Sequence, residues 1–176
     1  YGILFDGAWL WEEYLWTILK DAELGGKNFV HPTNKDRKGG IRLFDNSLDP
    51  EDSSFKKCYH RIYPDFYCEN SSEDSNDGII LDAKYKRLEN GLVRDDLYQI
   101  ISYMHTMKIS TGGFVYPQKE NEELAEQKPT KYLLANDTGI IKTFGFVIPQ
   151  NAREYTSFCN EIQKHELSLL SHFSKI

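Results

Sequence analysis

Cysteine is scarce in this sequence, and no two cysteines have the spacing of a metal site. The 176 residues include three, Cys58, Cys68 and Cys159, an odd number without a C-x-x-C motif. A disulfide framework, a zinc site or an iron–sulfur cluster would need paired or closely spaced cysteines. The pattern therefore predicts reduced thiols in a cytoplasmic protein.

Long hydrophobic runs and a nucleotide-binding loop are also lacking. No apolar stretch has membrane-spanning length, and no signal-peptide pattern is present. We therefore expect a soluble protein without a membrane partner. There is no G-x-x-x-x-G-K-S/T loop for phosphate binding, so any nucleotide hydrolysis must come from another protein.

Basic residues are outnumbered, with 21 Lys and Arg against 27 Asp and Glu and a net charge of −6. This balance argues against broad nonspecific binding to nucleic acid. Much of the acid falls in predicted loops at 49–52, 69–77 and 120–126, and bound cations reverse the field at a carboxylate site. A specific nucleic-acid site therefore remains compatible with the charge.

The length and composition fit one globular domain over residues 1–176. The content of 40% hydrophobic and 14% aromatic residues is enough for a substantial core. The first residue is Tyr1 and not Met. We therefore expect the domain to be the C-terminal part of a longer protein whose N-terminal region is absent.

The most informative stretch runs over residues 63–86, where two strand-like segments flank a polar interval. That interval ends in Asp77-Gly78, which is typical of a hairpin turn. Side chains alternate along a strand, so Asp82 and Lys84 project from one face. Pairing of the two strands would bring Asp65 beside them. The sequence thus predicts two carboxylates and one ammonium within a few ångströms.

This combination predicts a metal site. Oxygen ligands without histidine or cysteine favour a hard ion such as Mg²⁺. Such an ion could offset charge on a phosphoryl oxygen and acidify a water, with Lys84 orienting that water or stabilising negative charge. The alternative interpretation is a surface aspartate and a lysine at a strand end.

A first helix is predicted over residues 5–19, with Asp6 as its N-cap. Glu12 falls on or beside the apolar stripe of this helix. A carboxylate that faces the core needs a partner, and a metal or the lysine of the central strand would supply one. Alternatively, Glu12 is a surface acid at the edge of the stripe.

A second helix is predicted to open at 94–96, with Asp95 as a candidate cap, and to run to about Ile109. Gln99 and Tyr103 are four residues apart, so they share one line on the helix surface and can act together. By themselves they are ordinary helix residues.

The remaining elements are predicted to complete the fold. Residues 23–40 read as irregular, with a small basic loop at 34–40 that could touch phosphates or simply be solvated. Strands are predicted at 41–44, 112–117, 131–135 and 140–148, the last interrupted by Gly145. An amphipathic helix follows from Asn151, with His165 and His172 facing solvent at its end. His60 is interpreted as a polar face residue.

Four signals occur in an order that resembles a known nuclease superfamily. A first-helix glutamate, Pro64-Asp65, Asp82-Ala83-Lys84 and Gln99-x-x-x-Tyr103 together resemble the RecB-like branch of the PD-(D/E)xK nucleases. More closely, segments 9–15, 63–67, 81–87 and 96–103 resemble the nuclease domain of McrC, the cleavage subunit of McrBC-type modification-dependent restriction systems.

The resemblance implies an α/β fold with a PD-(D/E)xK restriction-endonuclease-like core, a central mixed β-sheet flanked by helices. It implies that Asp65, Asp82 and the backbone carbonyl of Ala83 bind Mg²⁺, with Mn²⁺ as a substitute. Lys84 would be the catalytic lysine, and Glu12 a further ligand or an outer acid. Gln99 and Tyr103 would line the site and contact DNA or orient its ligands.

The implied function is metal-dependent endonucleolytic cleavage of DNA, together with a McrB-like AAA+ GTPase that contacts a region largely outside this chain. Two alternatives stay open: a RecB-like exonuclease or single-strand nuclease in repair or defence, and a catalytically silent domain that docks DNA or a partner. Some RecB-like nucleases carry a histidine on an early helix. No histidine precedes Glu12, which makes the exonuclease relatives a poorer match.

Overall fold

A five-stranded mixed sheet forms the centre of the structure, a computed structural model that describes residues 6–24, 26–32, 39–44, 60–69, 78–86, 91–119 and 129–173. The strands lie in the order β5 (Phe66–Glu69), β6 (Gly78–Ala83), β7 (Thr111–Lys119), β9 (Ile140–Ile148) and β8 (Thr130–Leu133). The central pairs β6–β7 and β7–β9 are parallel, whereas the edge strands β5 and β8 pair antiparallel. The α/β prediction with a central mixed sheet is confirmed.

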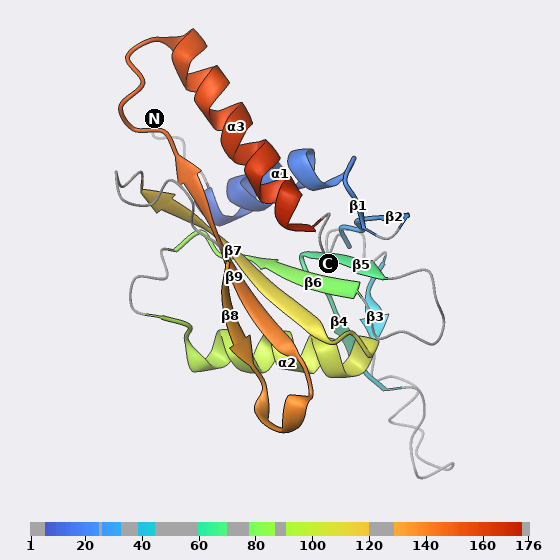
Figure 1. The fold of residues 1–176 in the computed structure, drawn as a ribbon. Coiled ribbons are helices and arrows are strands. Elements are labelled where there is room, and N and C mark those ends of the chain that lie inside the picture. Colours follow the sequence, from blue (N-terminus) through green and yellow to red (C-terminus); the bar gives the residue numbers. More distant parts are fainter. Residues whose placement is uncertain are drawn as a thin grey trace, which may run out of the picture.

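Helices cover both faces of this sheet (Figure 1). α1 (Gly7–Leu19) and α3 (Tyr155–Phe173) lie on one face, and α2 (Arg94–Met107) lies on the other. Alternation along β6 supplies both layers, because Ile79 and Leu81 pack with α1 and α3 while Ile80 packs with α2. β6 is therefore buried on both faces, as its apolar sequence predicts.

Consecutive glycines in β7 allow this close packing. A Cβ on Gly112 would lie 2.9 Å from Cγ1 of Ile100 in α2, and one on Gly113 would lie 2.8 Å from the Phe144 ring. A side chain at Gly112 would press against Ile100 and Met104 of α2, and one at Gly113 would press against Phe144 and Leu81.

Short elements complete the fold. β1 (Glu23–Leu24) pairs with β2 (Lys27–Asn28), β3 (Ile41–Arg42) pairs with β4 (Arg61–Ile62), and the 3₁₀ helix η2 (Ala135–Asp137) joins β8 to β9. The prediction of an irregular segment at 23–40 is wrong for residues 23–28, because Gly26, at φ of 83°, supports a tight hairpin there. No helix in the described ranges is long and apolar enough to span a membrane.

The helix ends show which local predictions hold. Asp6 caps α1 as predicted, since its carboxylate accepts hydrogen bonds from the backbone N–H groups of Ala8 and Trp9, each at 3.1 Å. The predicted cap Asp95 is wrong: the N-cap of α2 is Val93, with no side-chain cap bond. Asp95 instead lies in the first turn, where an acid favours the helix dipole.

Several further expectations need correction or lie outside the described residues. Gly145 does not interrupt β9, which is continuous. His172 and His165 are partly buried, and the His172 ring lies 6.0 Å from that of Phe144. The predicted turn at 70–77, the basic residues at 34–38, the acidic loops at 49–52 and 120–126, and Cys58 lie outside the described residues.

Candidate active site

Asp65 and Asp82 meet where β5 begins and β6 ends. The antiparallel register pairs Phe66 with Leu81, which brings the residues just beyond that pair together. The Asp65 carboxylate accepts a hydrogen bond of 2.7 Å from the backbone N–H of Ala83. The predicted juxtaposition of Asp65 with the Asp82-Ala83-Lys84 segment is therefore present.

Lys84 is held between two carboxylates from different elements. Its Nζ lies 2.7 Å from Oδ2 of Asp82 in β6 and 3.0 Å from Oδ1 of Asp96 in the first turn of α2. Its backbone N–H donates to the Val115 carbonyl of β7 at 2.9 Å. Lys86 adds a second cation, with Nζ 2.7 Å from Oδ2 of Asp96. Both the main chain and the ammonium of Lys84 are thus fixed.

Burial governs the protonation of the two central acids. Asp82 is 4% exposed, and burial raises its pKa although the Lys84 ammonium opposes that shift. Burial and the Asp82 carboxylate raise the pKa of Asp65 to about 8, against the lowering effect of the Ala83 N–H. Without a further cation nearby, Asp65 therefore favours its protonated form at neutral pH.

Lys84 and Asp96, the ion pair beside the two central acids, both favour their charged forms. Burial lowers the pKa of Lys84, but its contacts with Asp82 and Asp96 outweigh burial, and the net pKa is raised. Burial would raise the pKa of Asp96, yet Lys86 and Lys84 hold it below the usual value. The site thus has an ammonium beside two carboxyl groups, and the charge of Asp82 disfavours ionisation of Asp65.

The donor set suits a hard cation bound by few protein ligands. Mg²⁺ is commonly held by one or two carboxylates, with waters and substrate phosphates completing its shell. Among the residues that the structure describes, no three His, Cys, Asp or Glu side chains converge at metal-ligand spacing. Asp65 and Asp82 could therefore supply the one or two carboxylate ligands of such a site.

Glu12 reaches the same region from α1 through a residue not predicted from the sequence, His31. Oε1 of Glu12 lies 3.6 Å from Nε2 of His31, and Nδ1 of His31 lies 2.6 Å from the backbone oxygen of Asp65. Glu12 also raises the pKa of Asp65, which places its charge near that carboxylate. The sequence signal for His31 is weak, since it lies beyond the two-residue strands and has no ligand spacing to another histidine.

Gln99 and Tyr103 do not lie together on the helix surface as predicted. Tyr103 is 8% exposed and packs in the cluster between α2 and the sheet, because α2 turns the line through Ile100, Tyr103 and Met104 inward. Nε2 of Gln99, an exposed residue, donates to the Tyr103 hydroxyl at 2.9 Å. Burial raises the pKa of Tyr103, with smaller contributions from the charges of Asp82 and Asp65, so the hydroxyl lies near both acids.

Asp96 is a second site residue missed by sequence reasoning, which treated it only as part of the helix start. Its signal is the acid in the first turn of α2, a position that serves the helix dipole in any protein. Only the packing of α2 against β6 and β7 shows that this carboxylate faces Lys84.

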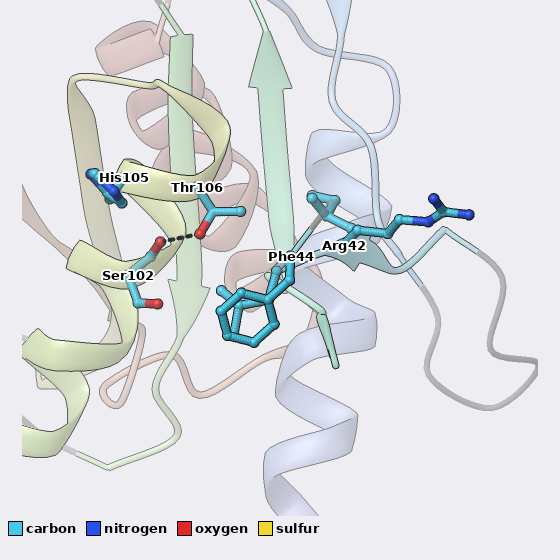
Figure 2. Close-up of a pocket in the computed structure, with 7 residues that line it drawn as sticks. Arg42, Phe44, Ser102, His105 and Thr106 are labelled. Carbon is cyan, nitrogen blue, oxygen red and sulfur yellow. Dashed lines mark hydrogen bonds between the residues drawn. The ribbon is translucent and has the colours of Figure 1, made fainter. Parts of the chain in front are cut away.

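A pocket of about 580 Å³ lies apart from these residues, between β3 and α2 (Figure 2). It is lined by residues of the segment 41–44 and by Ser102, His105 and Thr106. None of the predicted site residues lines it. Figure 2 shows the Arg42 side chain pointing away from α2 while Phe44 faces it.

Residues 1–117 match the model of a protein family described as the McrBC 5-methylcytosine restriction system component. The chain belongs to this family. The match covers all the predicted site residues and confirms the McrBC-type resemblance seen in the sequence motifs. A comparison with curated proteins gives no match.

Among solved structures, this McrBC-family chain is similar to a chain of the refined half-complex from the tetradecameric assembly of Thermococcus gammatolerans McrB AAA+ hexamers with bound McrC. The TM-score is 0.57 at 15% sequence identity, which is evidence for a shared fold alone. The likeness covers 97% of this chain and 34% of the other, so the chain spans about a third of that protein's length.

Proposed function

We propose that this chain is the DNA-cleaving part of a McrBC-type restriction system, with a PD-(D/E)xK-type endonuclease site at Asp65, Asp82 and Lys84. The observation that carries the proposal is the pair of carboxyl groups at the β5–β6 junction, Asp82 buried and Asp65 partly buried, beside an ammonium held by ion pairs. Burying such acids costs stability, and carboxyl groups with raised pKa values cluster at functional sites.

Asp65, Asp82 and the backbone carbonyl of Ala83 would hold Mg²⁺, or Mn²⁺ in its place, with Glu12 as a further ligand or an outer acid. When bound, such an ion polarises a scissile phosphate and lowers the pKa of a coordinated water. The acids would be ionised once the cation is present, because a nearby positive charge favours the carboxylate form.

Lys84 would act on the substrate directly. Its raised pKa keeps it an ammonium at neutral pH, and Asp96 supplies a second anchor when Asp82 turns toward a cation. From this position Lys84 donates hydrogen bonds to the attacking water or to the phosphate oxygen that gains charge. An ammonium held before the reaction avoids the cost of reorganisation during it.

Gln99 and Tyr103 would line the α2 side of the site. The Tyr103 hydroxyl already accepts a hydrogen bond from Gln99, so its own proton is available to donate toward the acids or the DNA backbone. The Gln99 amide is exposed to solvent on this side of the site and would contact DNA.

The partners proposed are DNA and a McrB-type AAA+ GTPase ring, in the cytoplasm. Support comes from the family description, which names 5-methylcytosine restriction, and from the similar assembly, in which McrC is bound to McrB hexamers. Substrate choice and GTP hydrolysis would then lie with the ring, and strand cleavage with this chain.

The test is cleavage of supercoiled, 5-methylcytosine-containing plasmid with Mg²⁺, by the chain together with its McrB-type partner. We expect wild type and Lys164→Ala, a control on α3, to convert the supercoiled plasmid to nicked or linear DNA. Asp82→Ala and Lys84→Ala should lower the cleavage rate at least about 100-fold. Cleavage by Lys84→Ala at the wild-type rate would overturn the proposal. Cleavage of linear but not circular DNA would favour a RecB-like exonuclease.

A further inference from the structure

His31 links Glu12, the α1 acid of the proposed site, to the main chain of Asp65, just before β5. It follows β2 and the bridge between Val30 and Tyr67, which aligns this segment beside β5. From there one ring nitrogen lies 2.6 Å from the backbone oxygen of Asp65, and the other lies 3.6 Å from a Glu12 oxygen. A single side chain thus touches both the main chain before β5 and the acid of α1.

The ring has little freedom to turn away from these contacts. The His31 side chain is 6% exposed, and its ring centre lies 5.3 Å from the Trp16 ring and 5.0 Å from the Phe66 ring. Trp16 belongs to α1 and Phe66 to β5, so the same two elements clamp the ring by packing and contact its nitrogens. Packing on both sides fixes the direction in which each nitrogen points.

The chemistry of the Asp65 contact assigns one proton. A backbone carbonyl only accepts hydrogen bonds, so Nδ1 of His31 carries the hydrogen of the 2.6 Å contact. Nε2 then faces the Glu12 carboxylate. One ring nitrogen thus donates a hydrogen bond to a main-chain oxygen, and the other faces an acid. Through these two contacts, the histidine orients both groups.

We infer that His31 is a positioning residue for the proposed metal site, setting the Asp65 backbone and the Glu12 carboxylate in the geometry that a divalent cation needs. The inference rests on the proposed function. Residues that orient metal ligands typically contribute about 10- to 100-fold to metal affinity.

The test measures Mn²⁺ binding by calorimetry on the full chain, without DNA. His31→Phe keeps an aromatic ring between Trp16 and Phe66 but removes both polar contacts. His31→Asn can keep a donor near the position of Nδ1 for the Asp65 oxygen. We expect His31→Phe to bind Mn²⁺ at least about 10-fold more weakly than wild type and His31→Asn to fall between them, with His165→Gln as the unaffected control.

Melting curves separate positioning from folding. If His31→Phe has a much lower melting temperature than wild type, the Mn²⁺ affinity of His31→Asn tests the role of His31, because that variant keeps the main-chain contact. Wild-type binding with unchanged affinity in folded His31→Phe and His31→Asn would overturn the role of His31 alone. Absence of Mn²⁺ binding in the wild type would overturn the proposed function and the role of His31 with it.

A different observation concerns the surface beside this site. The register of the β3–β4 hairpin places Arg42 directly opposite Arg61, and both residues are exposed. Like charges on opposed residues destabilise a strand pair, so a bound anion would relieve the repulsion. The Arg61 guanidinium donates to the Gly40 carbonyl at 2.9 Å, whereas that of Arg42 points away from α2 (Figure 2).

The hairpin is close to Asp65 along the chain. Arg61 precedes Asp65 by four residues, and an extended chain spans at most about 14 Å over that distance. A strand of duplex DNA carries one phosphate per about 3.4 Å of helix axis, so this corresponds to about four nucleotides. The chain has a net charge of −6, so two exposed arginines within this distance supply positive charge that an anionic backbone needs.

We propose that Arg42 and Arg61 contact backbone phosphates of the DNA strand that enters the site, again on the basis of the proposed function. The test is the salt dependence of binding to a short labelled duplex in Ca²⁺, measured by anisotropy. Arg42→Gln/Arg61→Gln should reduce the slope of log K against log salt by about two, since each phosphate contact contributes about 0.9. The control is Arg153→Gln.

Mn²⁺ calorimetry on the same variants keeps the two ideas separate. The double variant should bind Mn²⁺ with wild-type affinity, because neither arginine is placed in the metal site. An unchanged salt slope, or no DNA binding by a wild type that binds Mn²⁺, would overturn the phosphate-contact surface and leave the metal site standing. Failure of the wild type to bind Mn²⁺ would instead overturn the proposed function on which the surface rests.

Discussion

Asp96 in the first turn of α2 lies 3.0 Å from the ammonium of Lys84, which also lies 2.7 Å from the Asp82 carboxylate. The contact ties a lysine that follows β6 to the helix that also carries Gln99 and Tyr103. It also gives Lys84 an anion that does not depend on Asp82. In the proposed site this matters, because Asp82 would share its carboxylate between a cation and Lys84.

Removal of this anchor should separate cleavage from metal binding. We expect Asp96→Ala to lower the rate of plasmid cleavage by about 10-fold or more, since Lys84 loses one of its two fixed contacts. Mn²⁺ affinity should stay near that of wild type, because Asp96 is not placed as a ligand. Asp95→Ala, one residue away and exposed, is the matched control. A variant that cleaves at the wild-type rate would show that Lys84 is held by other means.

Divalent metal should stabilise the folded chain. A ligand that binds only the native state raises the free energy of unfolding by about 2.7 kcal/mol at a concentration of 100 times Kd. We therefore expect Mg²⁺ to raise the melting temperature of wild type by several degrees and that of Asp82→Ala hardly at all. An equal shift in both proteins would place the ion elsewhere.

The metal-free protein should lose stability as pH rises from about 4 to about 8. The pKa of Asp65 is about 8 in the fold, against an ordinary value of 3.8. Below pH 3.8 the group is protonated in both the folded and unfolded states, so it contributes no difference. Between the two values the unfolded chain releases the proton and the folded chain retains it, which favours unfolding as pH increases.

Asp65→Asn should flatten that pH profile, because the variant cannot titrate at this position. The free energy of unfolding from urea titrations at several pH values, with chelator present, measures the effect. Saturating Mg²⁺ should flatten the wild-type profile as well, since the cation favours the carboxylate. A wild-type profile that rises steadily over this range would contradict the raised pKa of Asp65 in the folded chain.

The hydrogen bond between Gln99 and Tyr103 should contribute modestly to stability. Tyr103→Phe keeps the buried ring and removes only the hydroxyl, so we expect a loss of about 1 kcal/mol in the free energy of unfolding. Tyr98→Phe on the same helix, where the side chain is exposed, should be neutral. A loss of cleavage much larger than the loss of stability would mean that the hydroxyl also acts on substrate.

Local sequence signals predicted the elements that carry the site. The hairpin of β5 and β6 was evident from apolar segments around a polar interval, and alternation along β6 placed Asp82 and Lys84 on one side. The cap of α1 at Asp6 followed from residue type and position. These features depend on neighbours in the sequence, and such patterns can be interpreted without a fold.

Long-range contacts were not accessible in the same way. The pairing of Asp96 with Lys84 depends on how α2 is placed across β6 and β7, and the position of His31 depends on a bridge between Val30 and Tyr67. Tyr103 was assigned to the surface because helical spacing to Gln99 gives a shared line but not the direction of the core. Tertiary packing decides each of these contacts, and the spacing of residues along the sequence does not predict that packing.

Calorimetric titration of Mn²⁺ into wild type and Asp82→Ala, with plasmid cleavage measured on the same samples in the presence of the McrB-type partner, tests the central claim most directly. We expect wild type to bind the ion and cleave the plasmid, and Asp82→Ala to lose both while remaining folded. A wild type that binds no ion, or an Asp82→Ala protein that binds and cleaves as wild type does, would contradict the metal-dependent nuclease site.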